Sequence, residues 1–314
     1  MASARPWPQF HVLTLFTEGA PFDDGIALVD VERDFRELVE PFVDSYRGYT
    51  PRALASDGDD ARRLTADHRD WVEQHPRRSE LRNYNSTWAR VGFLAWKPYA
   101  LWKELARDDL NDGDIVMYHD VDLRKYPDFR AHVAQWRTLS LAILDELETD
   151  VFAPVGLPMG VDVKAFLVER YLDASYRHVR GVWAGLIVVR KSAMSAAFVE
   201  EWQQMSADLD NVSPLPNPHP YPEAAWHSGE QAVLSVLAAR WRQTGSLPAD
   251  WPRFATRGRR FGLTEIYPRG LRDGRIVGNV RTGYRILRSR PETAPVLDPA
   301  VRLAKRLQRL VRRA

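Results

Sequence analysis

Four Asp-x-Asp pairs occur in the sequence, and such a pair can hold a divalent cation through its carboxylate oxygens. Only one of them, Asp120 and Asp122, directly follows an apolar, strand-like run, at residues 115–118. Ligands of open α/β sheets bind beyond the carboxyl ends of strands, and an extended Asp-x-Asp presents both carboxylates to the same side. We therefore expect Asp120 and Asp122 to bind a metal ion; the alternative is a strand end capped by solvated acids. The other three pairs have ordinary surface contexts: Asp57/Asp59, Asp112/Asp114 and Asp208/Asp210.

The chemistry that suits this pair is the departure of a nucleoside diphosphate. Negative charge develops on the β-phosphate of that leaving group, and a divalent cation neutralises it as a Lewis acid. Mg²⁺ and Mn²⁺ prefer oxygen ligands and usually take only one or two carboxylates from the protein, while phosphates fill other positions. The pair therefore predicts Mn²⁺ or Mg²⁺ as a cofactor.

Sequence motifs of several other enzyme classes are missing from the chain. It has no GxSxG, Walker A or GxGxxG motif, and its eight histidines show neither HxxxH nor HExxH spacing. These absences argue against a hydrolase, a P-loop enzyme, a Rossmann dehydrogenase and a zinc site. Cysteine is also absent, which excludes disulfides and thiolate chemistry.

The elements that would position the acidic pair alternate between strand and helix patterns, which predicts an α/β protein with a mixed sheet flanked by helices. A proline-rich segment at 213–222 contains five prolines and is expected to form a stiff loop, either a lid or a wall of an acceptor site. Residues 56–80 are expected to form an exposed, partly helical excursion. The expected strands are 11–16, 115–118, 151–154 and 182–189, and the expected helices are 31–46, 93–110, 127–148, 163–172, 193–209 and 230–242.

The composition is that of an ordinary globular protein, with 314 residues of which 45% are hydrophobic and 27% charged. We expect one catalytic domain at 1–298. The start of the chain has no apolar signal-like segment, and the longest apolar run is too short to span a bilayer, so a cytoplasmic protein is expected.

The last sixteen residues, 299–314, form a separate basic segment with six Lys or Arg and no acid. The rest of the chain has 38 basic and 42 acidic residues, so its net charge is −4. Apolar and basic residues of 299–314 alternate at helical spacing, which predicts an amphipathic helix in weak peripheral contact with an anionic inner membrane face. A solvated helix packed on the body of the protein is the alternative.

Four sequence motifs in a fixed order resemble a family of bacterial glycosyltransferases associated with capsule and lipopolysaccharide assembly. They are TWARVGFLAWKPYALWKEL, DGDIVMYHDVD, GVWAGLIVVRKS and HSGEQAVLSVL, and together they cover roughly residues 91–237. The resemblance implies a GT-A fold, a nucleotide-sugar donor (a UDP- or GDP-sugar) and a saccharide or lipid-linked acceptor. One departure is Glu230, where the family usually has Asp.

Five residues are candidates for binding the donor, two by their charge and three through the resemblance. Lys97, flanked by aromatic residues, would pair with a phosphate or a carboxylate, and Arg90 would serve the diphosphate in the same way. Thr17 ends the first strand, where such enzymes receive the nucleoside. Trp183 and Gly185 would lie beside the donor sugar, with small residues that let the ring approach the backbone. Each has an ordinary structural alternative, as a helix start, a turn or a packed strand.

Glu230 and His227 are the expected catalytic residues. The Glu230 carboxylate would deprotonate the acceptor hydroxyl or stabilise an oxocarbenium-like centre, and His227 would orient it or bind the acceptor. We expect Ser228 to cap the helix that Glu230 begins, and Asp162 is the next candidate for the base. The alternative for Glu230 is an acid that interacts favourably with the helix dipole and has no catalytic role.

Two other functions compete with sugar transfer. A nucleotidyltransferase acting on sugar phosphates also uses carboxylates and a metal, but it is expected to carry a glycine-rich basic loop after its first strand, and residues 17–21 are acidic with a single glycine. A nucleic-acid-binding or nucleic-acid-modifying protein would use the Arg-rich C-terminus. The net negative charge of residues 1–298 and the absence of a motif for nucleic-acid recognition argue against nucleic acid as the partner.

Overall fold

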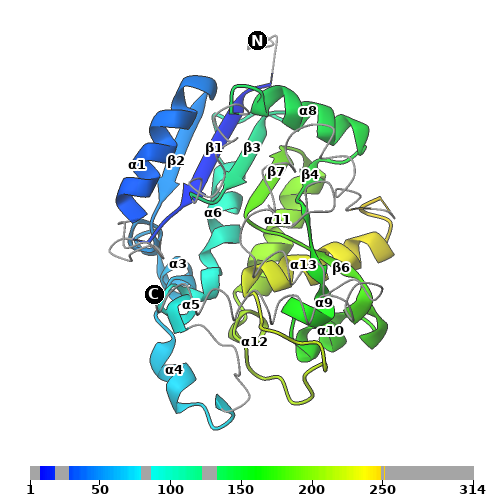
Figure 1. Ribbon diagram of the computed structural model, residues 1–314. Helices are drawn as coiled ribbons and strands as arrows, with labels where there is room; N and C mark the ends of the chain where they lie inside the picture. Colours follow the sequence, from blue (N-terminus) through cyan, green and yellow to red (C-terminus); the bar gives the residue numbers. More distant parts are fainter. Residues whose placement is uncertain (1–7, 18–27, 79–85, 122–132, 249–250, 252–314) are drawn as a thin grey trace, which may run out of the picture.

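A computed structural model describes residues 8–17, 28–78, 86–121, 133–248 and 251 (Figure 1). Asp122 and the basic segment 299–314 lie outside these residues, so the structure does not bear on their predicted roles. Within the described part of the chain, no helix is both long and apolar enough to cross a membrane.

A five-stranded mixed sheet forms the centre of the molecule, in the order β2-β1-β3-β7-β4. Strands β2, β1 and β3 are parallel to one another, β7 runs antiparallel to β3, and β4 runs antiparallel to β7. The predicted α/β class with a mixed sheet is therefore confirmed. The strands are β1 (Phe10–Leu15), β2 (Ser45–Tyr49), β3 (Ile115–His119), β4 (Val151–Phe152) and β7 (Leu186–Arg190).

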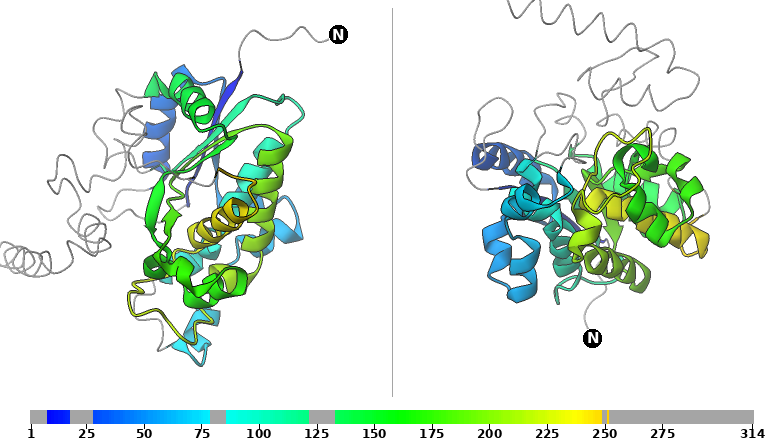
Figure 2. Two further views of the ribbon diagram at one scale, coloured as in Figure 1. Left: turned by 90° about the vertical axis from the view of Figure 1, so that its right-hand side faces the viewer. Right: turned by 90° about the horizontal axis from the view of Figure 1, so that it is seen from below.

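Helices cover both faces of this sheet, as the side view in Figure 2 shows. On one face, Phe35 of α1 and Trp136 of α8 both pack against the buried His119 ring of β3, with centroid distances of 5.5 and 5.1 Å. Helices α6 and α11 pack against each other on the opposite face. These helices are α1 (Leu28–Val39), α6 (Trp96–Leu105), α8 (Trp136–Glu146) and α11 (Ala193–Ser206).

A second, smaller layer lies below the sheet in Figure 1, where the two-stranded sheet β5–β6 packs on α13. Its elements are β5 (Val155–Pro158), α9 (Met159–Asp162), α10 (Ala165–Tyr171), η4 (Ala174–His178), β6 (Arg180–Val182), α12 (Leu209–Val212) and α13 (Glu230–Gln243).

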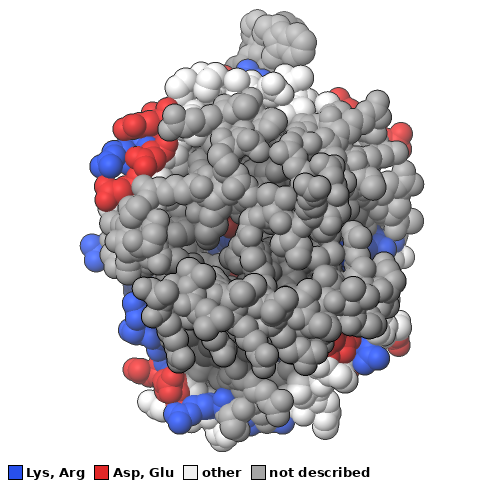
Figure 3. Space-filling view, in the orientation of Figure 1, with Lys and Arg blue, Asp and Glu red and all other residues white. Residues whose placement is uncertain are grey.

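Short helices form the lower left part of Figure 1, where the exposed excursion was predicted. They are α2 (Pro51–Ala55), α3 (Asp59–Leu64), α4 (Arg69–Gln74), α5 (Ser86–Arg90) and η3 (Gly92–Leu94), whereas the short helix η1 (Glu40–Phe42) connects α1 to β2. Acidic and basic side chains are mixed along the margin where α1 lies (Figure 3), as in the Arg33–Asp30 pair at 3.0 Å.

One expected helix and one expected strand differ most from the structure. The helix expected at 31–46 ends at Val39, and the edge strand β2 begins at Ser45; SYRGY lacks an apolar run because an edge strand needs no fully buried face. The single strand expected at 182–189 is two strands, β6 and β7, which belong to different sheets. The turn between them contains Trp183, Ala184 and Gly185 and brings backbone carbonyls to the carboxyl end of β3.

Candidate functional site

Three charged side chains from distant parts of the chain meet at the carboxyl end of β3. Lys97 comes from the first turn of α6, Asp120 directly follows β3, and Glu230 is the first residue of α13. The Lys97 Nζ atom lies 2.6 Å from Glu230 Oε1 and 3.8 Å from Asp120 Oδ1. Three residues predicted separately from the sequence therefore form one cluster.

Burial divides this cluster into an inner pair and an outer acid. The side chains of Lys97 and Glu230 are 5% and 2% exposed, whereas Asp120 is 40% exposed. Two carboxylates share one ammonium, so with all three groups ionised the cluster carries a net charge of −1. Asp120 is the member that a ligand in solution can reach directly.

The charges of this cluster shift the pKa values of the inner pair. Burial by itself lowers the pKa of Lys97, but the attraction of Glu230 and Asp120 outweighs it and raises that pKa above the ordinary value. Burial raises the pKa of Glu230; the Lys97 ammonium opposes this rise and the Asp120 charge adds to it. The ammonium is thus firmly protonated, while the Glu230 carboxyl is a stronger base than an exposed glutamate.

Backbone geometry fixes Lys97 in this position. Its Nζ atom donates to the Ala184 carbonyl at 3.2 Å and lies 4.8 Å from the centroid of the Tyr118 ring. The segment just before α6 has positive φ at three successive residues, Gly92, Phe93 and Leu94. Such strained backbone persists where the surrounding structure requires it, and here it turns the chain into the helix that carries Lys97.

Glu230 is held from both sides of its helix start. The Trp202 indole N–H donates to the Glu230 carbonyl at 3.0 Å. The residue before it, Gly229, has φ +61°, and a Cβ there would lie 2.5 Å from the Phe93 carbonyl oxygen. Ser228 is not the helix cap that the sequence predicted, because Gly229 occupies that position and the Ser228 hydroxyl donates to the Asp162 carbonyl at 3.0 Å.

Tyr118 orients Asp120, and the sequence analysis did not identify it. The Tyr118 hydroxyl donates to Asp120 Oδ1, and the Asp120 backbone N–H donates to the Gly185 carbonyl at 2.9 Å. The signal was present, because residues two apart on a strand face the same side. The same alternation turns His119 to the opposite face of the strand, where its side chain is fully buried.

Gln231 is a second positioning residue that the sequence analysis passed over. Its side-chain oxygen accepts from the Ala184 N–H at 3.0 Å, and its side-chain nitrogen donates to Asp162 Oδ2 at 3.1 Å. The glutamine after Glu230 therefore braces the same turn whose carbonyl holds Lys97. Asp162, the alternative base, is buried against this glutamine.

The predicted donor-sugar residues have a different arrangement from the one expected. A Cβ on Gly185 would lie 1.8 Å from the Trp183 indole, so the space above this glycine is filled by the ring of its neighbour. Position 185 therefore has no room for a side chain, because the Trp183 ring lies over it. Both residues belong to the turn that contacts Asp120 and Lys97, and a role beside a donor sugar stays a prediction.

Thr17 and Arg90 are not brought into contact with the cluster. Thr17 follows β1, which is parallel to β3, and so lies at the same edge of the sheet as Asp120. Arg90 is exposed at the end of α5. The pKa of Asp67 is lowered mainly by its hydrogen bond from Arg69, and the positive charge of Arg90 lowers it further. Their donor-binding roles stay predictions.

His227 has both ring nitrogens engaged with backbone. Nδ1 accepts from the Lys164 N–H at 3.2 Å, and Nε2–H donates to the Asn211 carbonyl at 2.8 Å. Burial, with the nearby charge of Lys164, lowers the pKa of His227 well below its ordinary value. This geometry describes a neutral histidine that ties chain segments together, and it favours a structural role over the predicted catalytic one.

The outer part of this site offers one carboxylate to a divalent cation, and the metal itself stays a prediction. Asp120 offers a half-exposed carboxylate whose second oxygen, Oδ2, accepts no hydrogen bond from the described residues. Among those residues no group of three or more His, Cys, Asp or Glu is placed to hold a metal. Mg²⁺ and Mn²⁺ sites that are completed by phosphates need only one or two carboxylates.

Comparisons of this chain with protein-family models, with curated proteins and with solved structures gave no match.

We expect Gly229→Ala to destabilise the protein more than Gly245→Ala. Both glycines have positive φ, so either alanine costs about 1–2 kcal/mol of backbone strain, but only the Cβ at 229 would meet another atom within 4 Å. The free energies of unfolding from denaturant titrations give the comparison. Equal losses for the two variants would show that the contact between Gly229 and Phe93 does not hold the site.

Lys97→Met should lower the free energy of unfolding at neutral pH by about 3–5 kcal/mol, because it leaves the Glu230 carboxylate buried without its ammonium. Loss of Lys97 raises the pKa of Glu230 further, so the folded state gains a proton at a higher pH than the unfolded state. The deficit relative to the wild type should therefore shrink as the pH falls and grow as it rises.

The double variant Lys97→Met/Glu230→Gln is the control, and it should be more stable than Lys97→Met alone. A deficit that is independent of pH and equal in both variants would contradict the buried ion pair.

Proposed function

We propose that this chain is a metal-dependent glycosyltransferase of GT-A type that moves a sugar from a nucleotide-sugar donor to a saccharide or lipid-linked acceptor. The observation that carries the proposal is the meeting of Lys97, Asp120 and Glu230 at the carboxyl end of β3. Open α/β sheets bind their ligands at this edge. Lys97 supplies a cation, Asp120 a carboxylate that can bind a metal, and Glu230 a buried base. Transfer of a sugar from a nucleoside diphosphate needs groups of these three kinds.

Asp120 is the proposed metal ligand, with Asp122 as its partner by sequence. A bound Mn²⁺ or Mg²⁺ would neutralise the charge that develops on the leaving diphosphate. The net charge of −1 in the cluster suits a divalent cation better than it suits a bare diphosphate. Tyr118 would prepare this carboxylate by occupying Oδ1, which leaves Oδ2 for the metal.

Lys97 is the proposed link between the donor and the base. The incoming diphosphate competes with Glu230 for the Lys97 ammonium, because phosphate oxygens are equally good acceptors for it. Movement of Lys97 toward the diphosphate would release Glu230 from its ion pair. Donor binding would in this way prepare the base before the acceptor reacts.

Glu230 is the proposed general base. Its Oε2 atom is buried and has no hydrogen-bond partner among the described residues, so it can accept the proton of an acceptor hydroxyl. Burial raises the pKa of Glu230, and a base is most effective when its pKa lies near the working pH. The N-terminus of α13 favours the carboxylate form in the resting protein.

The donor would be a UDP- or GDP-sugar, and the protein would work in the cytoplasm. Contact of 299–314 with an anionic inner membrane face would bring the enzyme close to a lipid-linked acceptor, and co-sedimentation of the full chain with anionic vesicles would show it.

Asp120→Ala should abolish Mn²⁺-dependent release of nucleoside diphosphate from UDP- and GDP-sugars while the protein stays folded, because Glu230 and the Ala184 carbonyl still compensate the Lys97 ammonium. Excess chelator should do the same to the wild type, and added Mn²⁺ or Mg²⁺ should restore release. Asp59→Ala, which changes the first residue of α3, is the matched control and should retain full activity. Full activity in chelator would contradict the metal assignment, and pyrophosphate release from a nucleoside triphosphate and a sugar phosphate would indicate a nucleotidyltransferase.

Glu230→Gln should keep the fold and donor binding but lower turnover about a hundredfold, the scale expected for a lost general base. Glu230→Asp should keep part of the activity, and Glu200→Gln on the exposed side of α11 should keep all of it. Turnover of Glu230→Gln within a few-fold of the wild type would reduce Glu230 to a structural acid at a helix start.

A further inference from the structure

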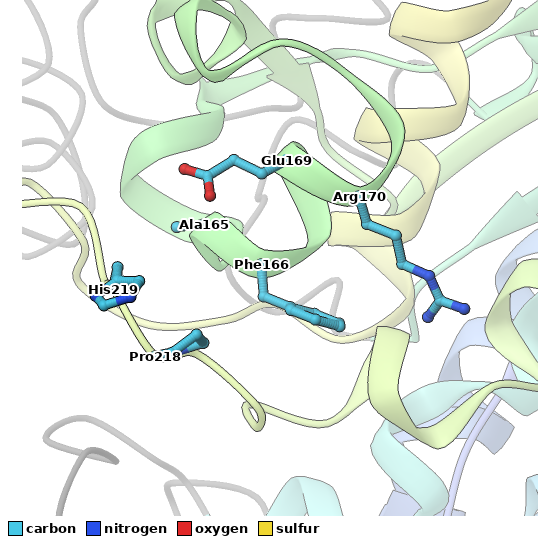
Figure 4. A pocket seen from close by; sticks show the side chains of 6 residues that line it. All are labelled: Ala165, Phe166, Glu169, Arg170, Pro218 and His219. Atoms are coloured by element: carbon cyan, nitrogen blue, oxygen red, sulfur yellow. The ribbon is translucent and has the colours of Figure 1, made fainter.

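The proline-rich loop 213–222 faces helix α10 across a cavity of about 290 Å³. Figure 4 shows Phe166 and Glu169 on the α10 side and Pro218 and His219 on the loop side. None of the six residues that line the cavity belongs to the Lys97 cluster; they are Ala165, Phe166, Glu169, Arg170, Pro218 and His219. The width of this cavity depends on the contacts that hold loop 213–222 in place beside α10.

The side chain of Lys164, just before α10, reaches into the base of this loop. It is 2% exposed, and its Nζ atom donates to the carbonyls of Ser213 at 2.7 Å and Leu215 at 3.0 Å, and also to that of Asp210. An ammonium group has three N–H donors, so these three carbonyls satisfy all of them.

The backbone of Lys164 ties a second connection to the same region. Its N–H donates to His227, which in turn donates to the carbonyl of Asn211. The Nζ atom also lies 5.6 Å from the centroid of the Phe166 ring, in the wall of the cavity. One residue therefore links the loop, the cavity wall and the segment that leads into Glu230.

Three converging carbonyl oxygens around a buried ammonium form a cation site built from backbone. Burial lowers the pKa of Lys164 to about 7, and the negative charges of Asp210 and Asp208 oppose this fall. A buried ammonium without hydrogen-bond acceptors would lose its proton. The three carbonyls therefore stabilise the protonated form of Lys164. Lys164 belongs to none of the roles in the proposed sugar transfer.

We propose that the carbonyls of Asp210, Ser213 and Leu215 form a binding site for a primary ammonium group, and that Lys164 occupies it as a lock on loop 213–222. The lock fixes the loop against α10 and sets the width of the cavity between them. Removal of the ammonium frees the loop while the central sheet stays intact. That the cavity admits a sugar of the acceptor rests on the proposed function; the lock does not.

The chain has no cysteine, so a single introduced thiol can report on this loop. Leu215 is fully buried, and Leu215→Cys places the reporter in the locked segment; Val188→Cys places a second reporter in the centre of β7. The rate at which each thiol reacts with a disulfide reagent measures how often its surroundings open. Addition of Lys164→Met should speed labelling at 215 at least tenfold and leave labelling at 188 unchanged.

Lys191→Ala is the matched control, because Lys191 also donates to two backbone carbonyls, those of Arg107 and Leu110, in another loop. It should leave labelling at 215 unchanged. In Lys164→Ala, added n-propylammonium, which replaces the missing atoms, should slow labelling at 215 toward the wild-type rate, whereas 1-propanol should not.

Two results would overturn the lock. One is labelling at 215 within twofold of the wild type in Lys164→Met, and the other is equal acceleration at 215 and 188, which would make Lys164 a determinant of global stability. Neither result bears on release of nucleoside diphosphate from a donor, so the lock and the proposed function can fail separately.

Discussion

The Lys97 ammonium is the group on which the organisation of this site depends. It is buried, and a buried charge is stable only with compensating charges and hydrogen bonds. Glu230, Asp120 and the Ala184 carbonyl supply them from the start of α13, the end of β3 and the turn between β6 and β7. Four segments must therefore meet at one point for the ammonium to be accommodated, which places the proposed base beside the proposed metal ligand.

The surrounding structure explains why this meeting is specific. The left-handed backbone of 92–94 and the glycine at 229 approach each other so closely that a methyl group would not fit between them. Gln231 braces the turn that contacts Lys97, and Trp202 holds the carbonyl of Glu230. The polar groups of the site are thus positioned by side chains and backbone that do not take part in the proposed chemistry, as precise placement requires.

Sequence patterns predicted the α/β class, the longer helices and the three members of the cluster, because apolar periodicity and the order of motifs are local properties. They did not predict β2, whose residues are polar and half exposed. They also did not predict that the apolar run 182–189 is interrupted at 183–185 and divides between two sheets. Lys164 was missed for a similar reason, since a lysine before a helix shows no sign that distant carbonyls enclose it. His227 was assigned a catalytic role by its neighbours in sequence, but its ring nitrogens bond to backbone brought there by tertiary folding.

The central claim is that the cluster at the end of β3 receives a nucleoside diphosphate through a divalent cation. Calorimetric titration of the full chain with UDP and with GDP, in Mn²⁺ and in excess chelator, tests this before any acceptor is known. The account predicts that one of the two nucleotides binds in Mn²⁺, and that binding is lost in chelator and in Asp120→Ala. Absence of binding for both nucleotides in Mn²⁺, or equal binding in chelator, would contradict it.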